Sequence, residues 1–100
     1  MKFNEFDQTV IEMLQEDPAF AVEYIKGAFA GLDEENGEVL FLLALRRLVE
    51  ARGGVSKIAA ETNLNRETLY RTLSERGNPT ISTTKKIINA AGISFAELTN

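Results

Sequence analysis

Apolar residues recur along the chain with the period of an α-helix, starting in its first segment. The residues there that share one helical face are Phe6, Val10, Met13 and Leu14. This spacing predicts a helix that packs against the rest of the protein through that face. A second helix is expected to begin at Asp17-Pro18, because an acidic N-cap followed by proline is a typical start signal, and to end at Gly31.

The strongest helical signal covers residues 38–52. Apolar residues occur there on too many sides for a single stripe, which predicts a helix that is buried on more than one side. Residues 33–37, of which the first three are acidic, are interpreted as a turn that leads into the N-terminus of this helix, where negative charge is favourable. Their spacing does not match the ligand positions of an EF-hand calcium loop. Gly53-Gly54 is expected to end the helix.

The elements that follow are short. A helix is predicted over residues 55–62 and another over residues 66–74, with Asn65 as the N-cap of the second. Asn63 suits the tight turn between them, because asparagine tolerates the left-handed backbone conformation that such turns often require.

The last part of the chain carries two further start signals. Ser82 or Thr83 is expected to cap a helix that runs through Ala91 and ends at Gly92, and Ser94 to cap a final helical turn. No segment alternates apolar and polar residues for long enough to predict a strand. The expected fold class is therefore all-α.

Composition limits the chemistry that the chain can carry. Its 100 residues are enough for one domain with a modest core, and they include no Cys and no His. Without Cys the chain can form neither a disulfide nor a thiolate site. Without His it lacks the commonest metal ligand and the commonest general base. We therefore expect no metal, no cofactor and no enzymatic activity. With no apolar run long enough to span a membrane and no signal peptide, the expected location is the cytoplasm.

Charge is divided unevenly along the chain. The formal net charge of −4 by itself argues against a nucleic-acid partner. Residues 1–38, however, hold two basic and ten acidic residues, a charge of −8, whereas residues 39–100 hold nine basic and five acidic residues, a charge of +4. Such asymmetry indicates partners better than the total does. Two differently solvated surfaces would produce the same division, so charge alone leaves both interpretations open.

Residues 55–73 have the spacing of a helix-turn-helix. In its second helix, Leu69 and Leu73 face one way. The residues on another, polar face are Arg66, Glu67, Tyr70 and Arg71. Such a face suits the DNA major groove, since arginine binds guanine bidentately and glutamate accepts a hydrogen bond from cytosine. Helical bundles with no nucleic-acid role have the same spacing, so the spacing alone does not decide between the two.

Several motifs follow one another from Asp17 to the end of the chain. They are Asp17-Pro18, Ala51-Arg52-Gly53-Gly54 before Val55-Ser56, residues 66–73, and Gly77-Asn78-Pro79 directly after Leu73-Ser74-Glu75-Arg76. Together they resemble the Xre/Cro-type helix-turn-helix family and, more narrowly, the HigA-type addiction-module antidotes. The Gly-Asn-Pro sequence after the second helix is fairly specific to the antidotes.

The resemblance implies a five-helix helix-turn-helix domain, here residues 38–100. One or two N-terminal helices would precede it in an acidic extension, residues 1–37, packed on the domain. It also implies a homodimeric antitoxin that binds double-stranded operator DNA, represses transcription of its own operon and neutralises a RelE-like, ribosome-dependent mRNA nuclease.

The family pattern also assigns roles to residues of this chain. Base-reading residues would be Arg66, Glu67, Tyr70 and Arg71. Contacts to the DNA backbone would come from Ser56, Lys57, Arg76, Asn78 and Thr80. The chain departs from the family at Asn63, where glycine is usual, and it lacks the glutamine that often opens the preceding helix in repressors.

Other charged and aromatic residues are expected to have ordinary roles. Arg46 and Arg47 are expected at solvated positions, and Lys85 and Lys86 either on the surface for solubility or against the DNA backbone. The aromatic residues expected in the core rather than in a binding platform are Phe3, Phe6, Phe20 and Phe29.

Three functions therefore remain in competition. The first is a DNA-binding antitoxin and autorepressor. The second, compatible with the first, is a protein-binding module in which acidic residues 1–38 cover the basic RNA-binding surface of a nuclease. The third is a stand-alone, phage-type transcriptional repressor with no toxin partner.

Overall fold

The computed structural model of the protein describes residues 1–99, and this part of the chain folds into helices joined by short loops. Its elements are α1 (Glu5–Glu16), α2 (Pro18–Ala30), α3 (Gly37–Ala51), α4 (Val55–Thr62), α5 (Arg66–Thr72), α6 (Ile81–Ala90) and the 3₁₀ turn η1 (Phe95–Leu98). No strand occurs between residues 1 and 99, which confirms the all-α prediction. Within the same residues, none of the helices combines the length and apolar character needed to cross a membrane. An Xre/Cro-type arrangement and a domain boundary after residue 37 stay predictions.

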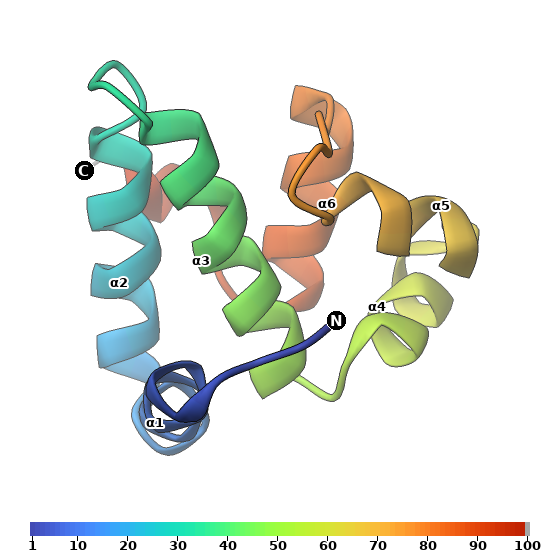
Figure 1. Ribbon diagram of the computed structural model, residues 1–100, viewed down its shortest axis with the longest axis horizontal. Helices are drawn as coiled ribbons and strands as arrows, with labels where there is room; N and C mark the ends of the chain where they lie inside the picture. Colours follow the sequence, from blue (N-terminus) through green and yellow to red (C-terminus); the bar gives the residue numbers. More distant parts are fainter. Residues whose placement is uncertain (100) are drawn as a thin grey trace.

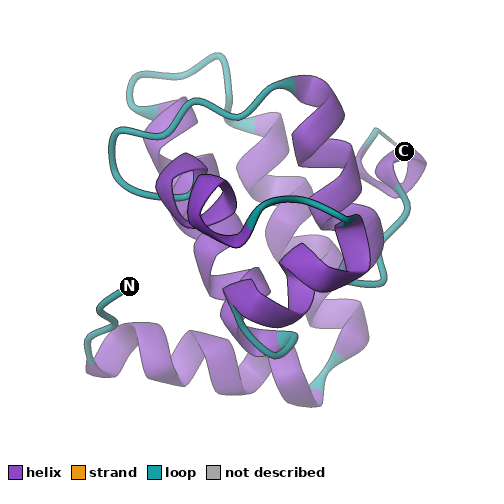
Figure 2. Cartoon of the chain, turned by 90° about the vertical axis from the view of Figure 1, so that its right-hand side faces the viewer, coloured by secondary structure: helices purple, strands orange, loops and turns teal. Residues whose placement is uncertain are grey.

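Helix α3 lies at the centre of the molecule (Figure 1). Helices α1 and α2 pack against α3, and α4 also contacts it. Helix α4 in turn packs against both α5 and α6, and η1 returns to α2. Figure 2 is turned so that α4 and α5 face the viewer, and it shows α1 lengthwise below them. The chain thus forms an α1–α2 side and an α4–α6 side, joined through α3.

One hydrophobic core runs through both sides. Fully buried large side chains come from all six α-helices: Leu14, Ile25, Leu45, Leu48, Val49, Ile58, Leu69, Leu73, Ile87 and Ile88. Because α3 contacts α1, α2 and α4, it is buried on more than one side, as predicted. Val39 and Leu40 near its N-terminus are exceptions, since both are exposed.

Capping side chains lie where the sequence predicts them for several elements. The Asp17 carboxylate accepts a hydrogen bond from the Phe20 N–H at 3.1 Å, and Gly31 follows the last residue of α2. Asn65 caps α5 and Ser94 caps η1 in the same way. These bonds join residues close together in the sequence, so the local pattern is sufficient to predict them.

Helix α6 begins earlier than predicted. Neither Ser82 nor Thr83 is its N-cap, because Thr80 takes that place with an extended backbone and accepts a hydrogen bond from the Thr83 N–H at 3.1 Å. Several hydroxyl side chains are available in this segment, and the one nearest the preceding loop satisfies the first unpaired N–H of the helix. Helix α5 likewise ends at Thr72 rather than at residue 74.

The buried face of α1 differs from the predicted one. The buried residues are Asp7, Val10, Ile11 and Leu14. Phe6 and Met13 are exposed, so the prediction is wrong for both. The helix is turned so that Asp7 reaches Arg47 of α3, which moves Phe6 to the surface. Among the other predicted core phenylalanines, Phe20 and Phe29 pack partly buried against the core, and Phe3 is half-buried.

Candidate nucleic-acid interface

A tight turn joins α4 to α5. Asn63 adopts the left-handed conformation, with φ 58° and ψ 31°, and the Leu64 N–H donates to the Ala59 carbonyl at 3.0 Å. Asn65 then starts α5 by accepting a hydrogen bond from the Thr68 N–H at 2.9 Å. The expected left-handed turn at Asn63 and the expected cap at Asn65 are thus confirmed. Because Ala59 is small and buried, the two helices approach closely.

The polar face of α5 points to solvent. Its apolar side, Leu69, is buried in the core. The four exposed residues of the predicted reading face line one open hollow together with Ser74; they are Arg66, Glu67, Tyr70 and Arg71. Within residues 1–99 no ion pair engages the charged members of this set. The two guanidinium groups and the carboxylate are therefore free to meet the hydrogen-bonding groups of a ligand, whereas the Tyr70 hydroxyl is bonded to the N-terminus.

The first turn of α4 lies next to this face. Ser56 and Lys57 are exposed there, and Lys57 makes only a loose ion pair with Glu61, at 4.0 Å. Gly54, the residue before the helix, provides no side-chain cap. Backbone N–H groups of the first turn are therefore not bonded to a capping side chain, as an anion-binding helix terminus requires.

The loop between α5 and α6 holds the other predicted backbone contacts. Arg76, Asn78 and Thr80 are exposed. The Thr80 hydroxyl already caps α6, so its N-cap role accounts for that side chain. Gly77 lies where a β-carbon would be 1.6 Å from the Thr72 carbonyl oxygen, so the loop folds tightly back on the end of α5.

A cavity of about 230 Å³ opens beside the same loop. Its walls are mainly apolar and come from α2, α3, α6, η1 and residues 77–79. Glu38 supplies a carboxylate to it. Among residues 1–99, no three His, Cys, Asp or Glu side chains come together as metal ligands would.

The N-terminal segment lies against α5, a contact that the sequence did not predict. The Met1 ammonium group donates a hydrogen bond to the Tyr70 hydroxyl. Met1 and Phe3 also line a hollow together with Arg66 and Tyr70. Met1 and Tyr70 are 69 positions apart in the sequence, and no local pattern could indicate that they meet.

Two arginines of the basic segment are bonded inside the protein. The Arg46 Nη1 donates to the Leu73 carbonyl oxygen at 2.8 Å, at the end of α5. The Arg52 Nε donates to the Ala91 carbonyl oxygen at 3.0 Å, and its Nη1 donates to the Leu14 carbonyl oxygen at 2.9 Å. One guanidinium therefore satisfies carbonyl groups at the C-terminal ends of both α1 and α6.

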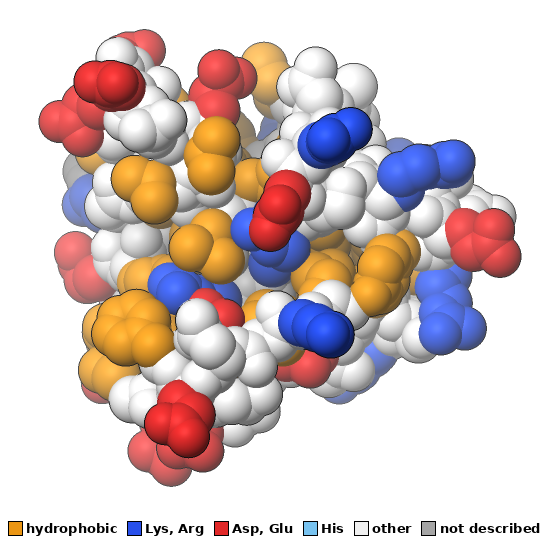
Figure 3. All heavy atoms as spheres, in the orientation of Figure 1, with side chains coloured by type: hydrophobic (Ala, Val, Ile, Leu, Met, Phe, Trp, Pro, Cys, Tyr) orange, Lys and Arg blue, Asp and Glu red, His pale blue; other side chains and the backbone are white. Residues whose placement is uncertain are grey.

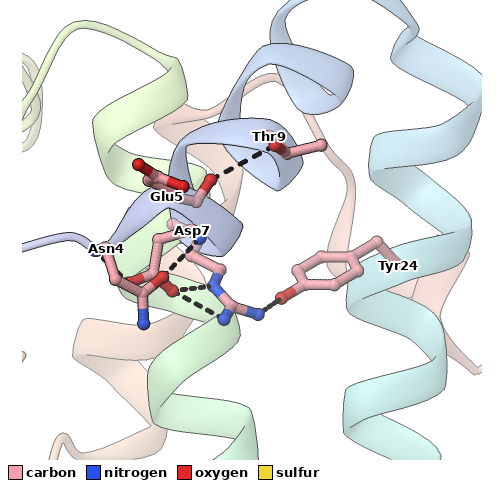
Figure 4. A network of polar contacts seen from close by, with 6 residues as sticks. Asn4, Glu5, Asp7, Thr9 and Tyr24 are labelled. Atoms are coloured by element: carbon pink, nitrogen blue, oxygen red, sulfur yellow. Dashed lines mark hydrogen bonds and ion pairs between the residues drawn. The ribbon is translucent and has the colours of Figure 1, made fainter.

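Arg47 forms a buried polar network. Its Nε donates to Asp7 Oδ1 at 2.8 Å, its Nη2 lies 2.6 Å from the same oxygen, and its Nη1 donates to the Tyr24 hydroxyl at 2.8 Å. In Figure 4 dashed lines mark the bonds that join Asp7 and Tyr24 through this guanidinium. The Asp7 Oδ2 also accepts from the backbone N–H of Asn4 at 2.9 Å. The network joins α1, α2 and α3, and the prediction that Arg46 and Arg47 occupy solvated positions is wrong.

The network shifts the pKa of its ionisable groups. The pKa of the Asp7 carboxyl lies below its ordinary value: the hydrogen bond from the Asn4 backbone lowers it most, burial opposes this, and Arg47 lowers it further. For Arg47, burial lowers the guanidinium pKa, but hydrogen bonds to Tyr24 and Asp7 raise it above the ordinary value. Both groups are therefore ionised at neutral pH.

Acid is expected to weaken the fold through Asp7. Its folded-state pKa is below the unfolded value of about 3.9, so the ionised carboxylate stabilises the fold above that pH. This stabilisation is lost as the pH falls through the folded-state pKa. Urea unfolding of the wild-type protein and Asp7→Asn from neutral to acid pH measures the difference. We expect the wild-type advantage to shrink below about pH 4; an advantage of constant size would contradict the assignment.

The exposed positive charge of residues 39–99 lies on the α4–α6 side. With three arginines bonded internally, the exposed basic residues after residue 38 are Lys57, Arg66, Arg71, Arg76, Lys85 and Lys86. All of them lie on α4, α5, α6 or the loop before α6. Figure 3 shows most Lys and Arg side chains of this view on its right-hand half. The charge that a phosphate backbone would meet is therefore on the same side as the exposed face of α5.

Comparisons with known proteins agree with part of the resemblance. A family model described as "probable addiction module antidote protein" matches residues 2–99. An uncharacterized protein of Haemophilus influenzae is 42% identical to the chain over 64 residues, which are 64% of this chain and 64% of that protein. The match therefore spans less than two thirds of that relative's length. No solved structure matches the chain.

Proposed function

Since residues 2–99 match its model, the chain belongs to the family of probable addiction module antidote proteins, and from this premise we propose that it is the antitoxin of a type II toxin-antitoxin module. In this proposal it binds double-stranded operator DNA as a homodimer and represses its own operon. It also neutralises its toxin. More narrowly, we propose a HigA-type antidote with an Xre/Cro-type helix-turn-helix and a RelE-like mRNA nuclease as its toxin.

The exposed polar face of α5 is the observation that carries DNA binding. Helix α5 buries Leu69 while its opposite side offers hydrogen-bonding groups without internal ion pairs. In the proposed complex α5 lies in the major groove. There Arg66 and Arg71 donate to guanine, Glu67 accepts from cytosine, and Tyr70 contacts a sugar or a thymine methyl group.

Contacts to the DNA backbone would position α5. We assign them to the first turn of α4, where Ser56 and Lys57 are exposed, and to Arg76 and Asn78 in the loop before α6. The Thr80 hydroxyl caps α6, so we expect Thr80 to contribute through the placement of that helix rather than through its side chain. A homodimer would bind two half-sites about one helical turn apart.

The α1–α2 side would serve the second half of the function. Residues 1–38 carry a charge of −8, and the basic side chains that are exposed after residue 38 lie elsewhere. A nuclease that binds RNA presents a basic surface, which an acidic protein surface complements. We therefore assign toxin binding to the acidic part of the chain and DNA binding to the basic part.

Removing Arg66 is expected to weaken operator binding. The Arg66→Ala protein should lose about 1–3 kcal/mol of binding free energy and relax specificity at one base pair, because a bidentate contact to a base is lost. The measurement is a titration of DNA from upstream of the chain's own gene, with each base pair of the site varied in turn.

Two further variants separate base reading from charge. Arg76→Ala should weaken binding to all sequences alike and reduce the salt dependence by about one ion, as expected for a phosphate contact. Lys26→Ala on α2 should leave DNA binding unchanged. If Arg66→Ala binds with the affinity and selectivity of the wild-type protein, α5 does not read the bases through this residue. Operator binding without any toxin partner would favour the stand-alone repressor.

A further inference from the structure

An apolar surface remains uncovered on α3. Val39 and Leu40 are 58% and 57% exposed, and Leu43, one turn further on, is partly exposed. These residues share the side of α3 opposite its buried face, which contains Phe41, Leu45 and Leu48. The protein therefore presents apolar side chains over the first two turns of its central helix.

Phe6 of α1 extends this surface. Its ring is 66% exposed and lies against the Arg47 guanidinium, 5.3 Å from ring centroid to Cζ. Arg47 is one turn after Leu43 on the same side of α3, so Phe6 continues the row formed by the leucines. We call Phe6, Val39, Leu40 and Leu43 the α3 stripe. Figure 3 shows hydrophobic side chains over α3 and, across basic and acidic atoms that lie between them, over α1.

Phe6 is held in position by the buried network below it. The Asn4–Asp7 capping box fixes the first turn of α1, and the ion pair between Asp7 and Arg47 fixes the cation under the ring. A fixed aromatic side chain on the surface loses little conformational entropy when a partner covers it. Rigid aromatic anchors of this kind are typical of the centres of protein interfaces.

Acidic residues flank the stripe at both ends. At the N-terminal end of α3 the exposed acids are Asp33, Glu34, Glu35 and Glu38. At the other end are Glu5, next to Phe6, and Glu50, which is three turns after Val39 on the same side of α3. Arg47 is paired with Asp7. Arg46, which donates to a backbone carbonyl, and the exposed Lys2, which lines a hollow with Leu43, add positive charge here, but the six acidic residues outnumber them. In Figure 3, acidic side chains lie above and below the hydrophobic side chains over α3 and α1.

The charges select the partner. A second copy bound about a two-fold axis would bring acidic residues of one stripe against acidic residues of the other, and like charges across an interface are unfavourable. Contiguous exposed apolar residues with a charged rim are typical of protein interaction sites. We propose that the α3 stripe docks an apolar segment of a basic protein, with its Lys or Arg side chains on the acidic rim. This inference rests on the proposed antitoxin function, because the toxin is that partner.

The double variant Val39→Ser/Leu40→Ser tests the proposal. Its binding to the purified product of the open reading frame next to the chain's own gene is measured by calorimetry, with the full chain. We expect the complex to weaken about 30-fold or more, as expected for two central apolar side chains. Because both residues are exposed, the melting temperature and operator binding should stay at wild-type values.

Met13→Ser is the matched control. Met13 is also an exposed apolar residue, but it lies two turns beyond Phe6 along α1, which Figures 1 and 2 show running away from the α3 surface. This variant should bind the basic protein as the wild type does. Raising the salt concentration should weaken the wild-type complex, because the acidic rim is exposed.

Three outcomes would overturn the inference. If the double variant binds as tightly as the wild type, the stripe is not the docking surface, although the antitoxin function stands. If sedimentation shows that the double variant has lost self-association, the stripe is a dimer interface. If the wild-type chain itself does not bind the neighbouring product, the toxin half of the proposed function fails and this inference fails with it.

Discussion

Replacing Arg47 with alanine is expected to lower the free energy of unfolding by about 3–5 kcal/mol, because the Asp7 carboxylate then remains buried without its partner. Arg47 makes every side-chain contact of the network that crosses from α3 to α1 and α2. Its loss also removes the cation beneath the Phe6 ring. Urea unfolding at neutral pH, followed by circular dichroism, measures the change.

A double variant distinguishes an uncompensated charge from lost packing. In Arg47→Met/Asp7→Leu both charges are replaced by apolar side chains, and we expect most of the stability to return. The Arg46→Met variant serves as a second control, since it removes a neighbouring guanidinium that bonds to a backbone carbonyl and not to a carboxylate. If the double variant is as unstable as Arg47→Ala, the burial of an unpaired Asp7 is not the cause.

Replacing Gly77 with alanine is expected to lower the free energy of unfolding by about 3 kcal/mol, because overpacking against backbone cannot be relieved by a side-chain rotation. The added β-carbon would lie 1.6 Å from the Thr72 carbonyl oxygen and 2.4 Å from the Thr72 carbonyl carbon. The end of α5 or the loop must move to admit it. Thermal and urea unfolding both report this loss.

Gly27→Ala is the control for the loss of a glycine. A β-carbon at Gly27, inside α2, would meet nothing within 4 Å, and alanine favours a helix over glycine by about 1 kcal/mol. This variant is therefore expected to be as stable as the wild type or more so. Wild-type stability of Gly77→Ala would show that the loop is not held at this distance from α5.

The Gly77 position explains one element of the motif that carried the resemblance. The Gly-Asn-Pro sequence suggested the antidotes, and its glycine has a packing reason in this chain: the loop closes against Thr72. Asn78 and Pro79 line the neighbouring cavity. The roles of Asn78 and Arg76 at the DNA backbone stay predictions that the operator titrations test.

The sequence predicted the order of the helices because the signals are local. Asp17, Asn65 and Ser94 cap their elements through bonds to N–H groups a few residues away. Asn63 adopts the left-handed conformation, which asparagine tolerates whatever its tertiary surroundings. The pattern did not identify Thr80 as the cap of α6, because this segment contains several equivalent hydroxyl groups in a row. The exposed face of α5 followed from helical spacing once Leu69 was assigned to the core.

The roles of the charged residues could not be predicted in this way. Arginine is usually found on the surface, so the sequence favours an exposed Arg47. Its partners Asp7 and Tyr24 lie 40 and 23 residues away in the chain, and no local pattern indicates them. The net charge of residues 39–100 therefore overstates the number of basic side chains that can contact DNA, because Arg46, Arg47 and Arg52 are bonded within the protein.

The sequence by itself therefore determined which segments are helical, where most of them begin and end, and which polar residues share a face of α5. Only the tertiary structure decided which way α1 turns, which arginines are internal, and that Phe6 and the first turns of α3 form one exposed apolar stripe. The physical reason is the distance along the chain over which each interaction acts. Helices and caps depend on hydrogen bonds between near neighbours, whereas burial and ion pairing depend on which helices meet.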